Sequence, residues 1–447
     1  MTPPGRLERL SGWGRYPVAE CRVTRPRETA EAAALAAEAP SLIARGLGRS
    51  YGDASLNPAL TVETGAMDRL LGFDAGTGLL TCEAGLSLAE IFALFLPRGW
   101  VVPVTPGTKF VTVGGMIAAD VHGKNHHRDG SFCDHLEWVE VALADGRVLR
   151  CSKTGHADLF AAICGGMGLA GLVLRAAFRM KRVETAQMRQ RTFRAANLDA
   201  AFDLFEGALD WTYSVGWIDC LASGRGLGRS VIFLGEHARA GELTARRTGE
   251  PLESRKRGTK KVPFDFPSFA LGPLSVRLFN QVYYRAHKDG EALVDLDAYY
   301  YPLDSIGQWN RIYGKRGFIQ YQCVLPLATS RQGIAGLLEL ISGAGLGSFL
   351  AVLKRMGPQS FGLLSFPMEG YTLALDFPAS DKALALMLRL DEIVVASGGR
   401  LYLAKDSRVG AAAFASGYDK LDRFRAIRRD WGLDGAFRSL QSERLEI

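Results

Sequence analysis

Four glycine-rich segments interrupt the first part of the chain, and they constrain its fold more than any other sequence feature. They read RGLGRSYGD, VTPGTKFVTVGG, VHGKNHHRDGS and CGGMGLAGLV, and short strands are expected between them. Glycine permits a positive φ and lets the backbone approach another group closely, at an entropic cost in the unfolded chain. Successive backbone N–H groups in such loops can hold a pyrophosphate without a lysine. The four loops together predict a large, flat, polar ligand such as a dinucleotide cofactor.

The segments that flank these loops argue against a Rossmann unit. The first loop runs from a predicted strand at 41–44 towards another at 60–64, with no amphipathic helix after the glycines. The GGMGLAG segment also leads into a strand. A Rossmann βαβ unit needs a helix whose N-terminus meets the pyrophosphate. A typical NAD-binding fold is therefore disfavoured.

Local patterns predict several further elements of the first domain. An alanine-rich helix is expected at 28–39, ended by Pro40, and the Ser87–Glu90 capping box opens a second helix that closes near Gly99. The segment 138–151 alternates like a hairpin, with Asp145-Gly146 at a type I′ turn.

A chain of 447 residues is too long for one ordinary core, so two domains are expected. We predict a first domain at 1–185 and a second, substrate-binding domain at 186–399, where aromatic residues become dense. The segment 400–447 is again rich in glycine and charged residues, like the first domain, and we expect it to pack against that domain.

The cysteines and the hydropathy indicate a reducing compartment. The seven cysteines are scattered and never spaced as CxxC, which argues against a disulfide framework and a zinc knuckle. No apolar run reaches the length of a membrane span, and the N-terminus has no signal-peptide core. We therefore expect a cytoplasmic protein with free thiols.

Most of the net charge of +7 comes from one segment. Between Arg225 and Lys261 there are ten Lys/Arg and four Asp/Glu, a balance of +6. The part at 239–261 is poor in apolar residues and is expected to be a mobile loop. Two interpretations remain open: a solvated loop, or peripheral contact with anionic lipid at the inner face of the plasma membrane. No nucleic-acid motif accompanies the charge, and no nucleic-acid partner is expected.

Four histidines cluster around the third glycine segment, at positions 122, 126, 127 and 135, with Asp120, Asp129 and Asp134 nearby. Their spacing matches no zinc template, so no metal is expected. His126 and His127 fit a role in satisfying the backbone of a buried loop. His122 follows the apolar GGMIAADV and precedes a glycine, which suits a side chain aimed into a cleft.

Together, RGLGRSYGD, PVTPGTKFVTVGGMIAADVHGKNHHRDGSF, FIQYQCVLP and GRLYLAKDSR resemble segments of a known family. The chain resembles the decaprenylphosphoryl-ribose-oxidase-like flavoproteins of the vanillyl-alcohol-oxidase (PCMH-type FAD) superfamily, and the resemblance continues through SRVGAAAFASGYDKLDRF. It implies an α+β fold in which a PCMH-type FAD-binding domain joins an antiparallel-sheet substrate domain flanked by helices. The cofactor that it implies is FAD.

The resemblance also implies which residues hold the cofactor. In covalent members of the superfamily a histidine of the first glycine loop is bonded to the flavin, whereas Arg49 stands at that place here. We therefore expect non-covalent FAD. The implied cofactor-binding residues are Ala44, Arg45, Gly46, Leu47, Gly48, Arg49, Ser50, Tyr51, Gly52, Asp53, Ala54, Gly107, Thr112, Val113, Gly114, Gly115, His122, Gly123, Lys124, Asn125, Val173 and Tyr402.

The resemblance places a substrate cavity over the flavin ring, with Lys405, Tyr51 and His122 as catalytic candidates. Lys405 can act as a base if burial lowers its pKa, or as a cation that stabilises reduced flavin. The substrate-binding candidates are Gln320, Gln322 and Lys354. The two glutamines alternate with Tyr321 and should share one face of a strand, where their amides suit sugar hydroxyls.

The implied activity is oxidation of the C2′ hydroxyl of a polyprenylphosphoryl pentose to the keto sugar. This would be the first half of a 2′-epimerisation in cell-envelope biosynthesis, which a separate NAD(P)H-dependent keto-sugar reductase would finish. The best-known member of the family carries a cysteine where this chain has Ala374, so the pockets are expected to differ there. Two alternatives remain open: an FAD-dependent oxidase of a soluble sugar or alditol, and a flavin-binding or basic membrane adaptor without turnover.

Overall fold

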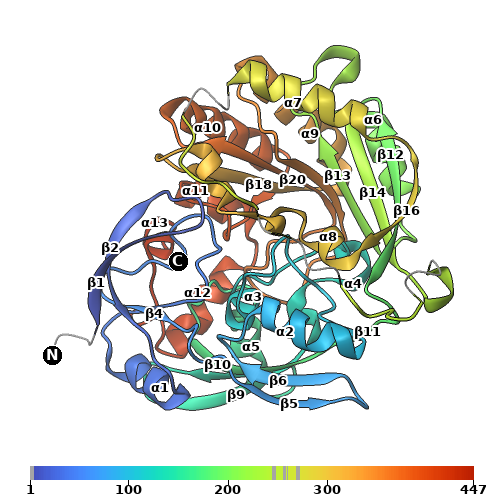
Figure 1. Cartoon of the computed structure of the whole chain (residues 1–447). Coiled ribbons are helices and arrows are strands. Elements are labelled where there is room, and N and C mark those ends of the chain that lie inside the picture. The colour runs from blue at the N-terminus through green and yellow to red at the C-terminus, as the bar shows by residue number, and fades with distance from the viewer. Residues whose placement is uncertain (1–4, 244–247, 255–257, 259, 268–271) are drawn as a thin grey trace.

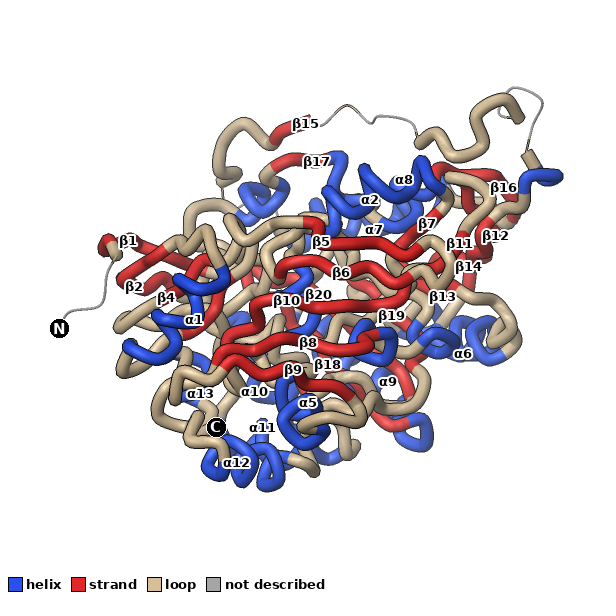
Figure 2. Tube along the Cα trace, turned by 90° about the horizontal axis from the view of Figure 1, so that it is seen from below, coloured by secondary structure: helices blue, strands red, loops and turns tan. Residues whose placement is uncertain are grey.

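The computed structural model describes residues 5–243, 248–254, 258, 260–267 and 272–447. Two sheets form the first part of the molecule (Figure 1). A four-stranded sheet has the order β1 (Arg6–Ser11), β2 (Val18–Thr24), β4 (Thr61–Glu63) and β3 (Ile43–Arg45). Figure 2 shows the second, five-stranded sheet, with β5 (Leu70–Asp74), β6 (Leu79–Glu83), β10 (Leu172–Arg179), β8 (Leu136–Ala142) and β9 (Val148–Ser152) in that order.

Short helices pack around these sheets, and two of them begin as the sequence predicts. Helix α1 (Thr29–Glu38) buries Ala32, Leu35 and Ala36 and ends before Pro40. Helix α2 (Leu88–Phe95) opens with the predicted Ser87–Glu90 capping box, and the following turn closes at Gly99, which has a left-handed φ of 79°. These predictions are confirmed. The other helices of this part are α3 (Val113–Ala118), α4 (His126–Asp129) and α5 (Ala157–Ile163).

The β8–β9 hairpin forms as predicted, but its turn differs from the prediction. The Leu143 N–H donates to the Arg147 carbonyl at 3.0 Å, so the loop is longer than the two residues of a type I′ turn. Gly146 takes a positive φ of 85°, whereas Asp145 does not. The type I′ prediction is therefore wrong, because a longer loop needs only one left-handed residue to reverse the chain.

The second part of the chain builds an eight-stranded antiparallel sheet. Helices α6 (Leu198–Glu206), α9 (Leu327–Ala344) and α10 (Asp381–Ala396) pack on it. In Figure 1, α8 (Leu296–Tyr300) lies towards the first part, whereas α7 (Pro273–Ala286) lies at the top of the view, away from the first part. The strand order is β16 (Gly290–Asp295), β12 (Gln187–Ala195), β14 (Ser230–His237), β13 (Tyr213–Ile218), β19 (Ala351–Met356), β20 (Gly370–Pro378), β18 (Phe318–Pro326) and β21 (Arg400–Leu401).

The C-terminal segment connects the two parts. After pairing with β18 as β21, it forms α11 (Ala411–Gly417), α12 (Leu421–Asp430) and α13 (Leu440–Arg444), and a bridge joins Phe437 to Leu42 beside β3. In Figure 1, α12 and α13 lie beside the N-terminal sheet, whereas α11 packs against α10 and β21. We propose units at 1–185, 186–399 and 400–447, a division that these pairings support.

The basic segment 239–261 lies only partly within the described residues. Its beginning forms a short helical turn, η4 (Ala240–Glu242). Its end forms β15 (Lys260–Lys261), which pairs in parallel with β17 (Ile306–Gly307). Residues 244–247, 255–257 and 259, on which much of the mobile-loop prediction rests, lie outside the described residues.

The seven cysteines are buried and free. In the described part of the chain, no helix is both long and apolar enough to cross a membrane.

A buried ion cluster ties α13 to the first glycine loop. The Arg444 guanidinium lies 2.8 Å from Asp53 and 2.9 Å from Asp406, and both carboxylates are nearly inaccessible to solvent. Removing one partner of a buried pair is costly because it leaves an uncompensated charge.

We predict that Arg444→Met lowers the free energy of unfolding by about 3 kcal/mol, since two buried carboxylates lose their counter-ion. Urea unfolding followed by tryptophan fluorescence measures the change. Arg438→Met is the matched control, because its pair with Glu443 is half exposed at 3.7 Å, and its loss should cost less than about 1 kcal/mol. Equal losses in both variants would contradict the prediction.

Candidate active site

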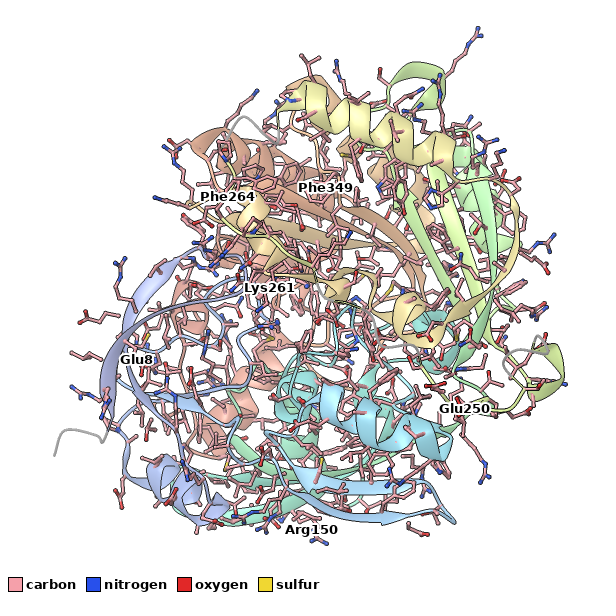
Figure 3. All side chains as sticks on the ribbon, viewed as in Figure 1. Glu8, Arg150, Glu250, Lys261, Phe264 and Phe349 are labelled. Carbon is pink, nitrogen blue, oxygen red and sulfur yellow. The ribbon has the colours of Figure 1, made fainter. Side chains whose placement is uncertain are left out.

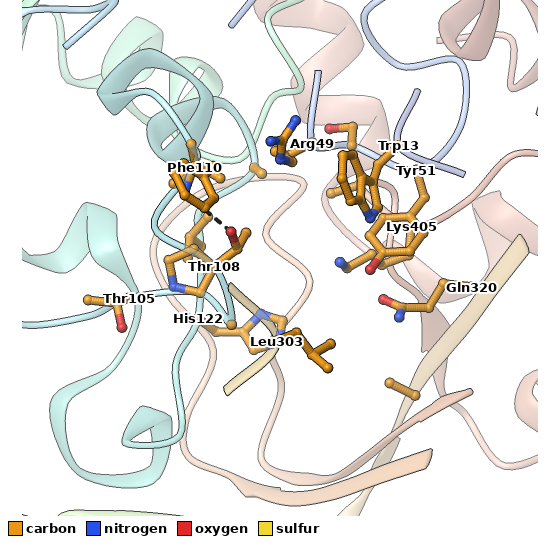
Figure 4. A pocket seen from close by; sticks show the side chains of 18 of the residues that line it. Trp13, Arg49, Tyr51, Thr105, Thr108, Phe110, His122, Leu303, Gln320 and Lys405 are labelled. Carbon is orange, nitrogen blue, oxygen red and sulfur yellow. Dashed lines mark hydrogen bonds between the residues drawn. The ribbon is translucent and has the colours of Figure 1, made fainter. Parts of the chain in front are cut away.

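A large cavity lies between the first part of the molecule and the inner face of the eight-stranded sheet. Its volume is about 1240 Å³, above the roughly 300–1,000 Å³ usual for one small ligand. The glycine segments line one side, and strands β13, β18 and β19 line the other. Figure 4 shows Tyr51, Lys405 and Gln320 on one side of the cavity and His122 on another. The cavity has room for a cofactor and a substrate together.

Glycines of the first loop are required because neighbouring segments of the chain leave no room for a side chain there. A Cβ on Gly46 would lie 2.2 Å from Thr112 Oγ1, and a Cβ on Gly52 would lie 2.0 Å from the Asp406 carbonyl oxygen. Gly48 has a positive φ of 62°. These glycines therefore let the loop pack closely against α3 and the C-terminal segment, and this contact fixes where the loop faces the cavity.

Four successive amides of this loop are free to bind a ligand. Among the described residues, the N–H groups of residues 47–50 meet no hydrogen-bond acceptor, and all four residues line the cavity. Consecutive unpaired N–H groups form an anion-binding nest. The Arg49 guanidinium lies 4.2 Å from the centre of the Trp13 ring and donates to the Leu47 carbonyl oxygen at 3.0 Å. The loop thus fits the pyrophosphate of FAD through its backbone.

Most of the residues predicted to bind the cofactor line the cavity, and four do not. Asp53 is paired with Arg444, and Gly52 packs on Asp406. Arg45 donates to Ser55 Oγ at 3.0 Å, and Val113 is fully buried in the core. The remaining residues line it: Ala44, Gly46, Leu47, Gly48, Arg49, Ser50, Tyr51, Ala54, Gly107, Thr112, Gly114, Gly115, His122, Gly123, Lys124, Asn125, Val173 and Tyr402.

His126 and His127 bond to backbone groups, as the sequence predicts. His126 Nδ1 accepts from the Gly357 N–H at 3.0 Å, and His127 Nε2 lies 2.8 Å from the Trp211 carbonyl oxygen. Both rings therefore satisfy backbone groups. Within the ranges that the structure describes, no group of three or more His, Cys, Asp or Glu could hold a metal.

His122 faces the cavity. Its Nε2 lies 3.2 Å from Gln322 Nε2, and its ring packs against Phe366 and Tyr402. Its buried Nδ1 has no hydrogen-bond partner in the part of the chain that the structure describes. Burial, followed by the nearby Lys354, holds the pKa of His122 well below its usual value. The imidazole is therefore neutral and can exchange a hydrogen bond with a ligand through Nδ1.

Lys405, Tyr51 and Gln320 meet around a buried carboxylate. Lys405 Nζ lies 3.8 Å from the centre of the Tyr51 ring. Gln320 Nε2 donates to Asp376 Oδ1 at 2.5 Å, and the Tyr313 hydroxyl donates to Oδ2 at 3.3 Å. Burial lowers the pKa of Lys405, while the Asp376 carboxylate opposes this shift. Burial likewise raises the pKa of Asp376.

Asp376 is a residue that sequence reasoning missed. It lies on β20 directly opposite Gln320 of β18. The available signal was a single acidic residue in the otherwise apolar run YTLALDFP. Such a residue is buried only when its hydrogen bonds are provided, as they are here.

The prediction that Gln320 and Gln322 share one face of a strand is confirmed. Gln320 and Gln322 both face the cavity from β18, and the Gln322 amide donates to Thr372 Oγ1 at 3.2 Å. Tyr321 points the other way, where its hydroxyl donates to Asp391 at 3.1 Å. Ala374 also lines the cavity, opposite Gln322 in the register.

Two further lysines give the cavity a positive character. Lys124 donates to the Tyr300 carbonyl oxygen at 3.3 Å and to that of Tyr299, so its amine is held by α8. Lys354 projects from β19 into the cavity, and its amine has no acceptor among the described residues. Burial lowers the pKa of Lys354 to about 8, and burial together with Lys354 lowers that of Lys124 to about 7. An anionic ligand group is the natural partner for Lys354.

Comparisons with known proteins agree with this geometry. The family model for the FAD binding domain matches residues 19–152. The chain is 37% identical to decaprenylphosphoryl-beta-D-ribose oxidase of Mycolicibacterium smegmatis over 99% of this chain and 98% of the relative. It is 35% identical to an uncharacterized protein in the mprA 5′ region of Streptomyces coelicolor, over 81% of this chain and 100% of the relative. Human delta(24)-sterol reductase is 30% identical over 25% of this chain and 22% of its own length.

The fold, the amide nest and these matches define an FAD-dependent oxidoreductase that acts on CH–OH groups, with a PCMH-type FAD-binding domain. The match to the M. smegmatis oxidase, which spans nearly all of both chains, identifies the family within this class. The chain belongs to the decaprenylphosphoryl-β-D-ribose oxidase family.

We predict that the FAD is not covalently bound, because Arg49 stands at the position where a linking histidine would be. The Arg49 guanidinium stacks on the Trp13 ring. After acid precipitation of the purified protein, the flavin should remain in the supernatant, as its absorbance will show. Yellow colour that persists in the washed pellet would contradict the prediction.

Proposed function

We propose that the chain oxidises the C2′ hydroxyl of a polyprenylphosphoryl pentose to the keto sugar, as the first half of a 2′-epimerisation. The observation that carries the proposal is that Lys405 and Tyr51 share one cavity with Lys354, whose amine has no acceptor among the described residues. The name of the M. smegmatis relative supports the choice of substrate. A separate NAD(P)H-dependent reductase would complete the epimerisation.

FAD, when bound, supplies the acceptor for the hydride that leaves the sugar carbon. The chain must then take up the hydroxyl proton, and Lys405 is our candidate for this step. Burial lowers its pKa and so increases the fraction of neutral amine near neutral pH. If Lys405 instead stays protonated, its charge stabilises negative charge that develops beside it. Tyr51, whose ring lies under Lys405, would orient the hydroxyl.

The substrate is held by groups that suit its two ends. The amides of Gln320 and Gln322, on one face of β18, suit the sugar hydroxyls, and His122 Nδ1 offers a further hydrogen bond. The Lys354 ammonium suits the phosphate. A soluble sugar would leave this charge without a counter-ion, which is costly in a largely apolar cavity. The geometry therefore favours a phosphorylated substrate over a free sugar or alditol.

A polyprenyl substrate resides in a membrane, so the protein must reach a lipid surface. We propose that it acts peripherally at the inner face of the plasma membrane. The positive balance of the segment around 239–261 supports such contact with anionic lipid.

The function is tested by mixing the anaerobic flavoprotein with polyprenylphosphoryl ribose and following the flavin absorbance. We expect bleaching with this substrate and much slower bleaching with free ribose or alditols. Faster reduction by the free sugar would favour the soluble-carbohydrate alternative, and no reduction by any sugar would favour the adaptor.

We predict that Lys405→Ala still purifies with FAD but loses flavin reduction by roughly a hundred- to ten-thousand-fold, the usual contribution of a positioned acid–base group. Single-turnover reduction is the measurement. Lys405→Arg keeps the charge and cannot give up its proton, so recovery would identify charge stabilisation and no recovery a base. Lys420→Ala, outside the cavity-lining set, is the control. A Lys405→Ala protein that is reduced at the wild-type rate would remove this lysine from the mechanism.

We also predict a pH dependence of substrate affinity. Lys354 has its pKa lowered to about 8, so its amine carries a charge below that pH and loses it above. Affinity for a short polyprenyl phosphate should fall by about tenfold as pH rises through 8, the loss of one charge-assisted hydrogen bond. Lys354→Arg should keep its affinity over the same range. Fluorescence titration measures both, and parallel profiles would refute the assignment.

A further inference from the structure

Helix α7 is fixed to the sheet by one face only. Val276 and Asn280 are buried, and Asn280 Nδ2 donates to Asp219 Oδ1 at 2.7 Å. The Tyr283 ring packs 4.6 Å from the Trp217 ring of β13. These contacts hold the helix in place and determine which residues point outwards.

The outward face of α7 is apolar. Leu274, Leu278 and Val282 follow one another at intervals of one helical turn and are 81%, 67% and 58% exposed. Phe279, beside them, is 42% exposed. Single exposed apolar side chains are ordinary on a protein surface, whereas a contiguous stripe of large ones marks a site of interaction.

Basic side chains lie on the same helix as this apolar stripe, and acidic side chains are absent from its sequence. Arg277 and Arg285 lie on α7, and the sequence from Gly272 to Lys288 contains no Asp or Glu. An apolar stripe with basic residues at its sides is typical of a helix that lies in the interface of a membrane.

The stripe stands at the rim of the active-site cavity. Phe279 and Tyr283 line the cavity from α7, and Ile306 and Gly307 line it from β17. The partner strand of β17 consists of the exposed residues Lys260 and Lys261.

An exposed aromatic residue stands in the same segment as these lysines. Phe264 is 62% exposed, and Figure 3 labels it together with Lys261 and Phe349. The neighbouring Asp265 is already paired with Arg15 at 2.6 Å. Exposed apolar and basic side chains therefore lie at the cavity rim both on α7 and on the segment that contains β15.

We propose that the outward face of α7 docks on an anionic lipid bilayer. Leu274, Leu278 and Val282 would enter the acyl region, and Arg277, Arg285 and the β15 lysines would meet the headgroups. The docked orientation turns the cavity mouth towards the lipid. In this respect the inference rests on the proposed function, since a polyprenyl chain could then pass from the bilayer beneath α7 to the flavin.

Charge argues against a second copy of the chain as the occupant. A two-fold interface places the same patch on both partners. Two α7 faces would bring the two arginines of one copy, Arg277 and Arg285, towards those of the other, with no acidic residue in either helix to compensate. Anionic headgroups provide that compensation.

The test is flotation of the holoenzyme with vesicles of equal parts phosphatidylglycerol and phosphatidylcholine. The combined variant Leu274→Gln, Leu278→Gln and Val282→Gln should lose at least about tenfold in partitioning, because the inserted apolar groups are gone. The control Leu388→Gln with Val395→Gln changes two exposed apolar residues of α10 and should float like the wild type. Pure phosphatidylcholine vesicles should bind the wild type more weakly, as should high salt.

A wild-type protein that does not float, or a triple variant that floats equally well, would overturn the proposal. Concentration-dependent dimers in light scattering that the triple substitution abolishes, without flotation, would identify a second copy as the occupant.

Anaerobic flavin reduction separates this inference from the proposed function. The triple variant should be reduced normally by a monomeric short-chain polyprenylphosphoryl ribose and slowly by a long-chain substrate in vesicles. If neither substrate reduces the wild type, the proposed function fails, while loss of flotation in the triple variant would still support the docking face.

Discussion

The contact between residues 51–53 and 404–406 is the constraint on which the site depends. The Tyr51 N–H donates to the Ala404 carbonyl at 2.9 Å, and Gly52 leaves room for the Asp406 carbonyl. Arg444 then neutralises both Asp53 and Asp406. This contact joins two segments that are far apart in the chain and puts Lys405 over the Tyr51 ring. The first glycine loop and the catalytic candidate are thereby fixed by one piece of packing.

Burial gives the amines of this site their chemistry. Burial lowers the pKa values of Lys405, Lys354 and Lys124, and the charge of Lys354 lowers those of the other two further. The carboxylate that opposes this shift at Lys405, Asp376, is itself held by Gln320 and Tyr313. Such a cavity favours a ligand that brings negative charge. A phosphate does so at one end, and a flavin does so on reduction.

Much of the local structure could be predicted from the sequence. The capping box at Ser87, the alanine-rich helix and the alternation of Gln320 and Gln322 are short-range patterns, and each formed as expected. The hairpin turn at Asp145 failed because loop length depends on where two strands stop pairing. Asp376 was missed because its partners come from another strand and a separate loop. Lys354 was recognised only through the family resemblance, and the structure places it on a strand facing the cavity.

The sequence by itself determined the glycine loops, the periodic elements and the family motifs, because these are properties of neighbouring residues. Only the tertiary structure showed why these positions must be glycine. A side chain on Gly46 would collide with Thr112, and one on Gly52 with Asp406, and both of these neighbours are distant in the chain. The tertiary structure also decided which amines are buried and which face of α7 is left exposed. Burial is a property of the packed whole, so pKa shifts and surfaces of this kind appear only when distant segments meet.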